Sequence, residues 1–263
     1  MAAPVREYRK ALRDMELPGG AALYGNFPSY SRFHPPEGRI RLLPATLLSR
    51  LFPSVLPRPL LGLDVGCNSG ELSVALYKHL LGLQESRASQ EHWNDLHLLC
   101  CDIDAGLIEK AEQRSPFPAS ICYATLNIMD PNARETLLSS YLTRFGRSTF
   151  DICFCMSVTM WIHLNHGDSG LVMFLSCLAS KCTYLLLEPQ PWKCYRAAAR
   201  RLRKLGRHDF DHFRSLTING NMADRITQIL TTDCAMELVS CFGSTNWDRR
   251  LLLFKSKESE LPL

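Results

Sequence analysis

The stretch Leu60-Leu-Gly-Leu-Asp-Val-Gly-Cys-Asn-Ser-Gly-Glu-Leu72 decides the fold of this chain. Its apolar first half is typical of a strand buried on both faces, and its second half is a glycine turn followed by helix-forming residues. Gly66 and Gly70 can adopt backbone angles that other residues avoid, so the chain can turn sharply and pass close to a ligand. The next helix begins with N–H groups that have no partner inside it. This pattern predicts the first strand, loop and helix of a nucleotide-binding α/β sheet.

A second acidic segment, Leu98-Leu-Cys-Cys-Asp-Ile-Asp104, reads as another buried strand that ends in carboxylates. An acid at the end of the second strand can accept hydrogen bonds from both ribose hydroxyls of a nucleoside, and Asp102 occupies that position. Asp104 can instead cap the helix expected at 105–114. The spacing from loop to acid exceeds the roughly 20 residues of a minimal unit, and a polar surface insertion at 84–94 would explain the excess.

Apolar runs alternate with helical segments along the rest of the chain, which predicts an α/β fold with a doubly wound, mostly parallel sheet of seven strands. Strands are expected at 60–65, 96–101, 121–126, 150–156 and 184–187, with a hairpin-like pair around 237–242 and 250–255. Helices are expected at 42–52, 71–81, 105–114 and 133–145, and one is expected to reach about 180 after an irregular run over 157–168. Residues 25–41 contain too much proline for a regular element. The strands' carboxyl ends should bring together 66–70, Asp102, Asn127, Met156 and 188–192.

Composition limits the class of protein. With 263 residues, 46% of them hydrophobic and 21% charged, the chain fits one large globular domain, and its net charge of +4 does not by itself indicate nucleic-acid binding. Its eleven cysteines include no C-x-x-C pair, so we expect no metal site, and thiols in apolar runs fit a reducing compartment. The N-terminus lacks a secretory apolar segment, and no run is long enough to span a membrane. We therefore expect a cytoplasmic protein with no membrane partner.

Positive charge is concentrated between Glu188 and Asp209, where seven Lys and Arg residues occur without an acid. Helical periodicity gathers them on one face, with Lys193, Arg196, Arg200, Arg203 and Arg207 in a stripe and Arg201 and Lys204 beside it. A solvated helix usually interleaves acids with bases, so this face favours a polyanion as its partner, with phosphates contacted by Arg196, Arg200, Arg203 and Arg207. A solvated surface helix is the alternative.

Five segments together resemble the Bicoid-interacting-3 type RNA methyltransferases: LDVGCNSG, CCDID, MWIHLNHGD, LLLEPQPW and the leader GNFPSYSRFHPPEGRIRLLP. The resemblance implies a class I methyltransferase (Rossmann-like) domain over 25–256, preceded by a flexible leader (1–24) and followed by a short polar tail (257–263). It implies S-adenosylmethionine (SAM) as methyl donor and O-methylation of a 5′-terminal RNA phosphate. The chain lacks long extensions and resembles the short branch of the family. For that branch the implied substrates are the 5′-monophosphate ends of histidine tRNA and precursor microRNAs. We expect a monomer that does not bind DNA.

The resemblance also assigns cofactor contacts. Arg39 in the leader, Gly66 and Asn68 in the loop and Asp102 at the ribose are expected to contact SAM, with Asn127 and Ile128 beside the adenine and Met156 beside the methionine. Asn127 stands where a carboxylate is common in the family, so we expect weaker binding there but not its loss.

The acceptor end is less clearly marked. Tyr30, Arg32, His163 and Lys193 are the candidates for positioning the phosphate, although His163 lies in an apolar run and can equally be a core histidine. A terminal phosphate has a second pKa of about 6 and is largely anionic at neutral pH, so alignment with an activated methyl can replace a general base. Two alternatives remain: a methyltransferase of this fold with another RNA or protein acceptor, and an inactive protein that binds SAM and RNA. A dehydrogenase is disfavoured because the G-x-G-x-x-G pattern is absent.

Overall fold

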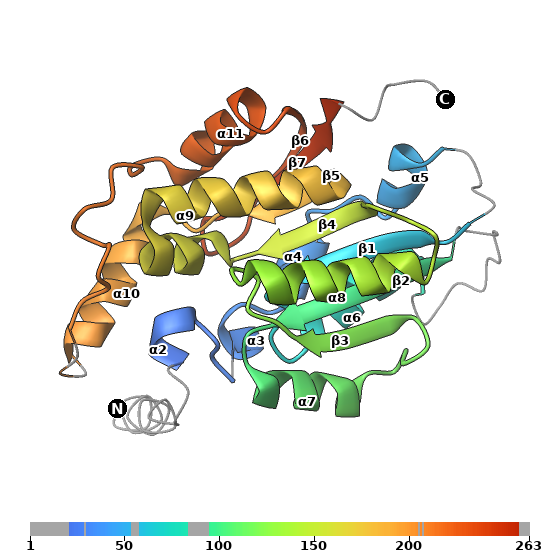
Figure 1. The fold of residues 1–263 in the computed structure, drawn as a ribbon, viewed down its shortest axis with the longest axis horizontal. Helices are drawn as coiled ribbons and strands as arrows, with labels where there is room; N and C mark the ends of the chain where they lie inside the picture. Colours follow the sequence, from blue (N-terminus) through green and yellow to red (C-terminus); the bar gives the residue numbers. More distant parts are fainter. Residues whose placement is uncertain are drawn as a thin grey trace.

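The computed structural model describes residues 21–28, 30–53, 58–83, 95–204, 206 and 208–257. This part of the chain is built on one seven-stranded sheet with the strand order β3-β2-β1-β4-β5-β7-β6 (Figure 1). The strands are β1 (Leu60–Val65), β2 (Leu96–Asp102), β3 (Ile121–Thr125), β4 (Phe150–Met156), β5 (Cys182–Glu188), β6 (Met236–Ser244) and β7 (Arg250–Ser256). The first five pair in parallel, whereas β7 is antiparallel to β5 and β6. The predicted mostly parallel sheet and its final hairpin-like pair are confirmed.

Helices cover both faces of the sheet, so every residue of its central strands β1 and β4 is buried. One buried core joins the sheet to α8 (Pro131–Thr143), α9 (Thr159–Lys181), α10 (Trp192–Lys204) and α11 (Met222–Thr232). A second core joins the other face to α5 (Leu47–Leu51), α6 (Glu71–Leu80) and α7 (Ala105–Arg114). Since β1 pairs with β2 on one side and β4 on the other, the winding reverses here, and ligands of such sheets bind outside the carboxyl ends at this point.

The segment 21–41 is more regular than expected. It forms the one-turn helices α2 (Ala21–Tyr24), α3 (Tyr30–Phe33) and α4 (Glu37–Ile40), while the helix expected at 42–52 is reduced to α5. Proline explains both differences, because Pro36 can begin α4 and Pro44 restricts the residue before it and delays α5.

Two further expectations about helices were wrong. The run expected to be irregular over 157–168 is helical from Thr159, and α9 bends at Gly167, whose φ of 69° and ψ of −172° are not helical. Helix α11 was not predicted, although its buried Met222, Ile226, Ile229 and Leu230 have helical spacing. The proposed insertion at 84–94 lies outside the described residues, as do 1–20 of the leader and 258–263 of the tail. Within the described residues, no helix combines the length and hydrophobicity that a membrane span needs.

Candidate functional site

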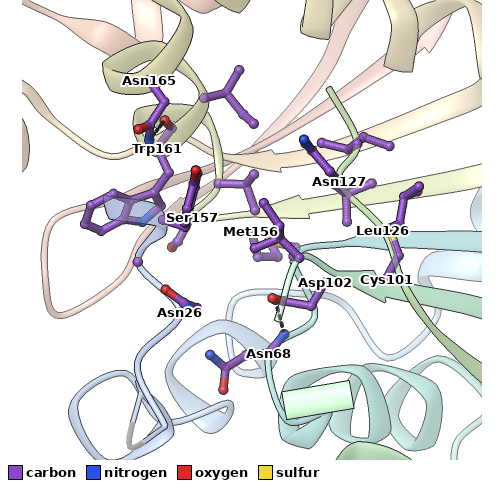
Figure 2. Close-up of a pocket in the computed structure, with 18 of the residues that line it drawn as sticks. Asn26, Asn68, Cys101, Asp102, Leu126, Asn127, Met156, Ser157, Trp161 and Asn165 are labelled. Carbon is purple, nitrogen blue, oxygen red and sulfur yellow. Dashed lines mark hydrogen bonds between the residues drawn. The ribbon is translucent and has the colours of Figure 1, made fainter. Parts of the chain in front are cut away.

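A cleft with about 790 Å³ of empty space lies at the carboxyl ends of β1, β2 and β4 (Figure 2). Its walls include most of the residues predicted to contact the cofactor, namely Gly66, Asn68, Asp102, Asn127, Ile128 and Met156. These residues come from four separate segments of the sequence, and the parallel sheet brings them to one edge.

The glycine loop after β1 forms one wall. Gly66 has a φ of +76°, and a Cβ on it would lie 2.3 Å from Val158 Cγ2, so both conformation and space require glycine. Asn68 also has a positive φ, of 54°, and its backbone N–H donates to Asp102 Oδ2 at 2.9 Å. This bond, drawn in Figure 2, fixes the loop against the end of β2.

Asp102 has a fixed orientation on the floor of the cleft. Its Oδ1 accepts the backbone N–H of Asp104 at 3.0 Å, and each of its oxygens keeps a lone pair for a ligand. Burial raises the pKa of Asp102, against the backbone hydrogen bonds from Asp104 and Asn68, which lower it. Asp104 caps α7 as expected, by accepting from Gly106 N and Leu107 N, and also accepts from Asn26 Nδ2 at 2.6 Å.

The opposite wall of the cleft holds Asn127 and Ile128. Asn127 is exposed, and its Oδ1 accepts the backbone N–H of Met129 at 3.1 Å. The amide oxygen expected to bind an adenine amine therefore already has one partner, and one lone pair of that oxygen remains. Trp161, Asn165 and His166 of α9 line the remaining side.

A second hollow, with about 410 Å³ of empty space, adjoins the cleft. Tyr30, Gly66, Asn68 and Met156 line both spaces, so the two hollows share a boundary. Arg39, expected at the cofactor, lies at this second hollow instead of the first.

Arg39 is part of a buried network of charges. Its side chain is 1% exposed and pairs with Glu188 of β5 at 2.8 Å. Its Nη2 donates to Tyr30 Oη at 3.1 Å and to Ser157 Oγ at 3.2 Å, and its guanidinium lies 4.9 Å from the Trp247 ring centroid. The contacts of Arg39 thus join its own N-terminal segment to the ends of β4 and β5 beside the cleft.

A second arginine, Arg249, reaches the same atoms from the turn between β6 and β7. Its Nη1 donates to Tyr30 Oη at 2.9 Å and to Ser157 Oγ at 2.6 Å. Its Nη2 lies 3.4 Å from His34 Nε2. Burial, followed by the charges of Arg249 and Arg39, lowers the pKa of His34 to about 4, so this imidazole is neutral at physiological pH. Two guanidinium groups therefore face one carboxylate, Glu188, and the network has a surplus positive charge.

Three of the four residues predicted to position the phosphate do not line either hollow. His163 is fully buried, with Nδ1 at 3.1 Å from Tyr195 Oη and Nε2 at 2.7 Å from Asp168 Oδ1, so the structure places it in the core. Lys193 is exposed and pairs with Asp248 at 2.7 Å, and Arg32 is exposed on α3. Only Tyr30 is placed where a cleft ligand can reach it.

The basic helix is present as α10, with Tyr195, Ala198, Ala199 and Leu202 buried on its inner face. Arg196 and Arg200 are exposed as expected. Arg203 pairs with Asp209 at 2.6 Å, and Arg201 lies over the Phe27 ring at 4.6 Å, so the positive face is narrower than predicted. Arg207 lies outside the described residues. The expected excess of charge on this face is therefore partly balanced by acids from neighbouring loops.

Sequence reasoning missed Ser157 and Arg249. Ser157 has a φ of 63°, which only the folded backbone reveals. Arg249 lies in a polar turn, and its side-chain hydrogen-bond partners are more than 90 residues away in the sequence. The only signal for Arg249 was the tryptophan and paired arginines between two apolar strands, N-W-D-R-R. Glu188, by contrast, was expected at this edge, because it ends an apolar strand.

Comparisons with known proteins identify the relatives of this chain. A family model described as Bicoid-interacting protein 3 matches residues 150–256. An RNA 5′-monophosphate methyltransferase of Bos taurus is 66% identical over 244 residues, which cover 92% of this chain and 84% of the relative. A pre-miRNA 5′-monophosphate methyltransferase of Xenopus laevis is 61% identical over 241 residues, which cover 90% and 93% of the two chains.

Solved structures with this fold include an N-methyltransferase, NodS of Bradyrhizobium japonicum, crystallised with S-adenosyl-L-homocysteine. The two folds superpose with a TM-score of 0.52 at 16% identity, over 95% of this chain and 98% of NodS. At this identity the likeness shows the fold alone, and the predicted class I methyltransferase fold is confirmed.

Proposed function

Because this chain belongs to the RNA 5′-monophosphate methyltransferase family, we propose that it transfers a methyl group from SAM to the terminal phosphate of RNA that carries a 5′-monophosphate. The observation that carries this proposal is the position of a buried, positively charged network directly beside the cleft that the predicted cofactor contacts line. A phosphate is the acceptor that such a charge favours, and a neutral hydroxyl or amine is not.

The cleft suits SAM. Asp102 offers lone pairs to the ribose hydroxyls, and Asn127 and Ile128 lie where the adenine ring would fit. Arg39, at the adjoining hollow, is proposed to contact the methionine carboxylate. SAM supplies a methyl group already activated by a sulfonium, so the chain's own residues need to bind, align and exclude water.

The acceptor phosphate is proposed to lie between Met156 and Tyr30, where the two hollows meet. A phosphate oxygen is anionic at neutral pH because its second pKa is about 6, and it needs no general base. The guanidinium of Arg249 contacts Tyr30 and Ser157 and is proposed not to contact the phosphate itself. Its positive charge therefore attracts the phosphate without pairing tightly with the oxygen that attacks. His163 is not proposed as a direct contact, since its ring is buried in the core.

Precursor microRNA and histidine tRNA are the proposed substrates. The Xenopus laevis relative is named for pre-miRNA, and the sequence resemblance supports histidine tRNA. Arg196 and Arg200 on α10 are placed to contact RNA backbone beyond the terminal phosphate. The buried cysteines support a reducing, cytoplasmic environment. We also propose that one copy of the domain, over residues 25–256, suffices for activity.

The test uses one RNA in two forms. The RNA with a 5′-monophosphate should incorporate label from methyl-labelled SAM, and the same RNA treated with phosphatase should not. Equal incorporation would assign the acceptor to a base or ribose. Binding of both SAM and RNA without turnover would instead favour the inactive binding protein.

A further inference from the structure

We propose that Arg249 is a positioning residue for the methyl transfer. It orients the Tyr30 hydroxyl so that this hydroxyl donates a hydrogen bond to the acceptor phosphate. This inference rests on the proposed function, because it assigns a role within the same site. Arg249 lies on a different element from the cofactor cleft and lines neither hollow, so it acts through Tyr30.

The hydrogen bonds of Tyr30 determine the direction of its proton. A tyrosine hydroxyl has one hydrogen and two lone pairs. Arg39 Nη2 donates to this oxygen at 3.1 Å and Arg249 Nη1 at 2.9 Å, so both lone pairs are occupied. The hydrogen is left to donate outward, and Tyr30 lines both hollows where they meet. Two positive neighbours also polarise this O–H bond and strengthen its donation to an anion.

Ser157 plays a different part in the network. Its Oγ accepts from both Arg39 and Arg249, at 3.2 and 2.6 Å, and donates to Glu188 Oε2. Its hydrogen is thus used inside the protein, whereas that of Tyr30 is free for a ligand. Ser157 keeps a φ of 63°, a conformation that is unfavourable for a non-glycine residue and that clusters at functional sites.

The two arginines are not equivalent. Arg39 forms an ion pair with Glu188, so its charge is compensated at contact. No carboxylate forms a hydrogen bond with Arg249 among the described residues, and its Nε is buried without a partner there. Arg249 therefore supplies the charge that remains available to an incoming phosphate, although only 7% of it is exposed.

The turn that carries Arg249 is rigid. Thr245 N donates to Arg249 O at 2.9 Å, Arg249 N donates to Thr245 Oγ1 at 3.1 Å, and Asp248 N donates to Thr245 O at 2.9 Å. Trp247 Nε1 in the same turn donates to Glu188 Oε1 at 2.9 Å. The guanidinium is thus held by its own backbone and by the network, as a positioning residue requires.

A double-mutant cycle with Tyr30→Phe and Arg249→Met tests the inference. Arg249→Met alone should lower kcat for 5′-monophosphorylated RNA about 30-fold, because it removes one member of a hydrogen-bond network. In the Tyr30→Phe background, which has no hydroxyl to orient, the same change should lower kcat by less than about threefold. Arg250→Met is the matched control, since Arg250 is exposed and pairs with Asp224 at 3.1 Å, and it should leave kcat within about twofold.

Arg249→Lys keeps the cycle decisive if the methionine variant does not fold. A single ammonium retains the charge without the fork that reaches both hydroxyls, so we expect partial loss of kcat that again disappears in the Tyr30→Phe background. Equal losses in both backgrounds would overturn the role of Arg249. A wild-type protein that does not methylate this RNA would overturn the proposed function, and the inference with it.

Discussion

Single residues prepare the cleft before a ligand binds. Asp102 is oriented by two backbone N–H groups, and Ser157 holds a positive φ with its hydroxyl fully used. Such preformed hydrogen bonds reduce the reorganisation that binding and alignment would otherwise cost. The residue scale is also where sequence reasoning reached its limit. Asp102 follows from its place after a strand, but the partners of Arg249 depend on how distant segments meet.

The cofactor assignment of Asp102 can be tested by removal of its carboxylate. Asp102→Ala should weaken SAM binding by about 1–3 kcal/mol, the value of a hydrogen bond to a charged group, and calorimetry measures it directly. Asp130→Ala is the control, because Asp130 is an exposed cap of α8. The control should lose about 1 kcal/mol of folding stability with unchanged SAM affinity. Unchanged affinity in Asp102→Ala would remove Asp102 from the ribose site.

His34 should make the folded state less stable at moderately acidic pH. Burial and the neighbouring Arg249 and Arg39 lower its pKa from 6.5 to about 4, so the unfolded chain takes up a proton that the folded chain does not. The titration of His34 leaves the free energy of unfolding unchanged above pH 6.5 and lowers it as the pH falls from 6.5 to about 4. His34→Gln cannot titrate and should show a smaller decline over this window in urea unfolding.

The comparison between the two proteins isolates His34. Other groups with shifted pKa values, such as His163 and Asp64, are present in both proteins and cancel in the difference. Identical slopes of stability against pH would contradict a neutral, buried role for the His34 ring.

At the scale of elements, the β-strands were easier to predict than the helices around the cleft. Continuous apolar runs located all strands of the described sheet, and Asp104 marked the start of α7. The start of α9 was missed because its first two turns carry histidine, asparagine and glycine, and the bend at Gly167 hides the period. Packing against Phe27, Phe210 and the sheet overrides these weak local preferences.

Helix α10 gives the prediction that belongs to this scale. Arg203 and Lys193 have acidic partners, so RNA contact should depend mainly on the exposed Arg196 and Arg200. Changing both to Glu should raise the KM for RNA, and each lost phosphate contact should reduce the log–log salt slope by about 0.7–0.9. SAM affinity should stay constant, because neither residue lines the cleft.

A charge reversal elsewhere separates local contact from general electrostatics. Lys110 and Arg114, exposed on α7, provide the matched pair, and changing them to Glu should leave the slope for RNA close to the wild-type value. An equal effect from both pairs would mean that net charge governs binding. An unchanged slope in the α10 variant would favour a solvated helix.

At the scale of the whole molecule, one parallel sheet gathers segments from across the chain at a single edge. The leader, the loop after β1, the ends of β2, β4 and β5 and the turn before β7 all contribute to the cleft or its network (Figures 1 and 2). The sequence alone predicted this edge, because carboxyl ends of parallel strands converge. It could not predict that the final hairpin would return Arg249 to the leader, since antiparallel pairing of β7 with β5 decides that contact.

Transfer of the methyl group to the terminal phosphate can be tested by the mass of the 5′-terminal nucleotide. RNA with a 5′-monophosphate is incubated with the protein and SAM, then digested, and the terminal nucleotide is compared with one from RNA incubated without SAM. We expect added mass of one or two methyl groups on the terminal phosphate, and we expect this mass to be lost when the phosphate is cleaved from the nucleoside. Added mass that stays on the nucleoside, or an unchanged terminal nucleotide, would contradict transfer to the phosphate.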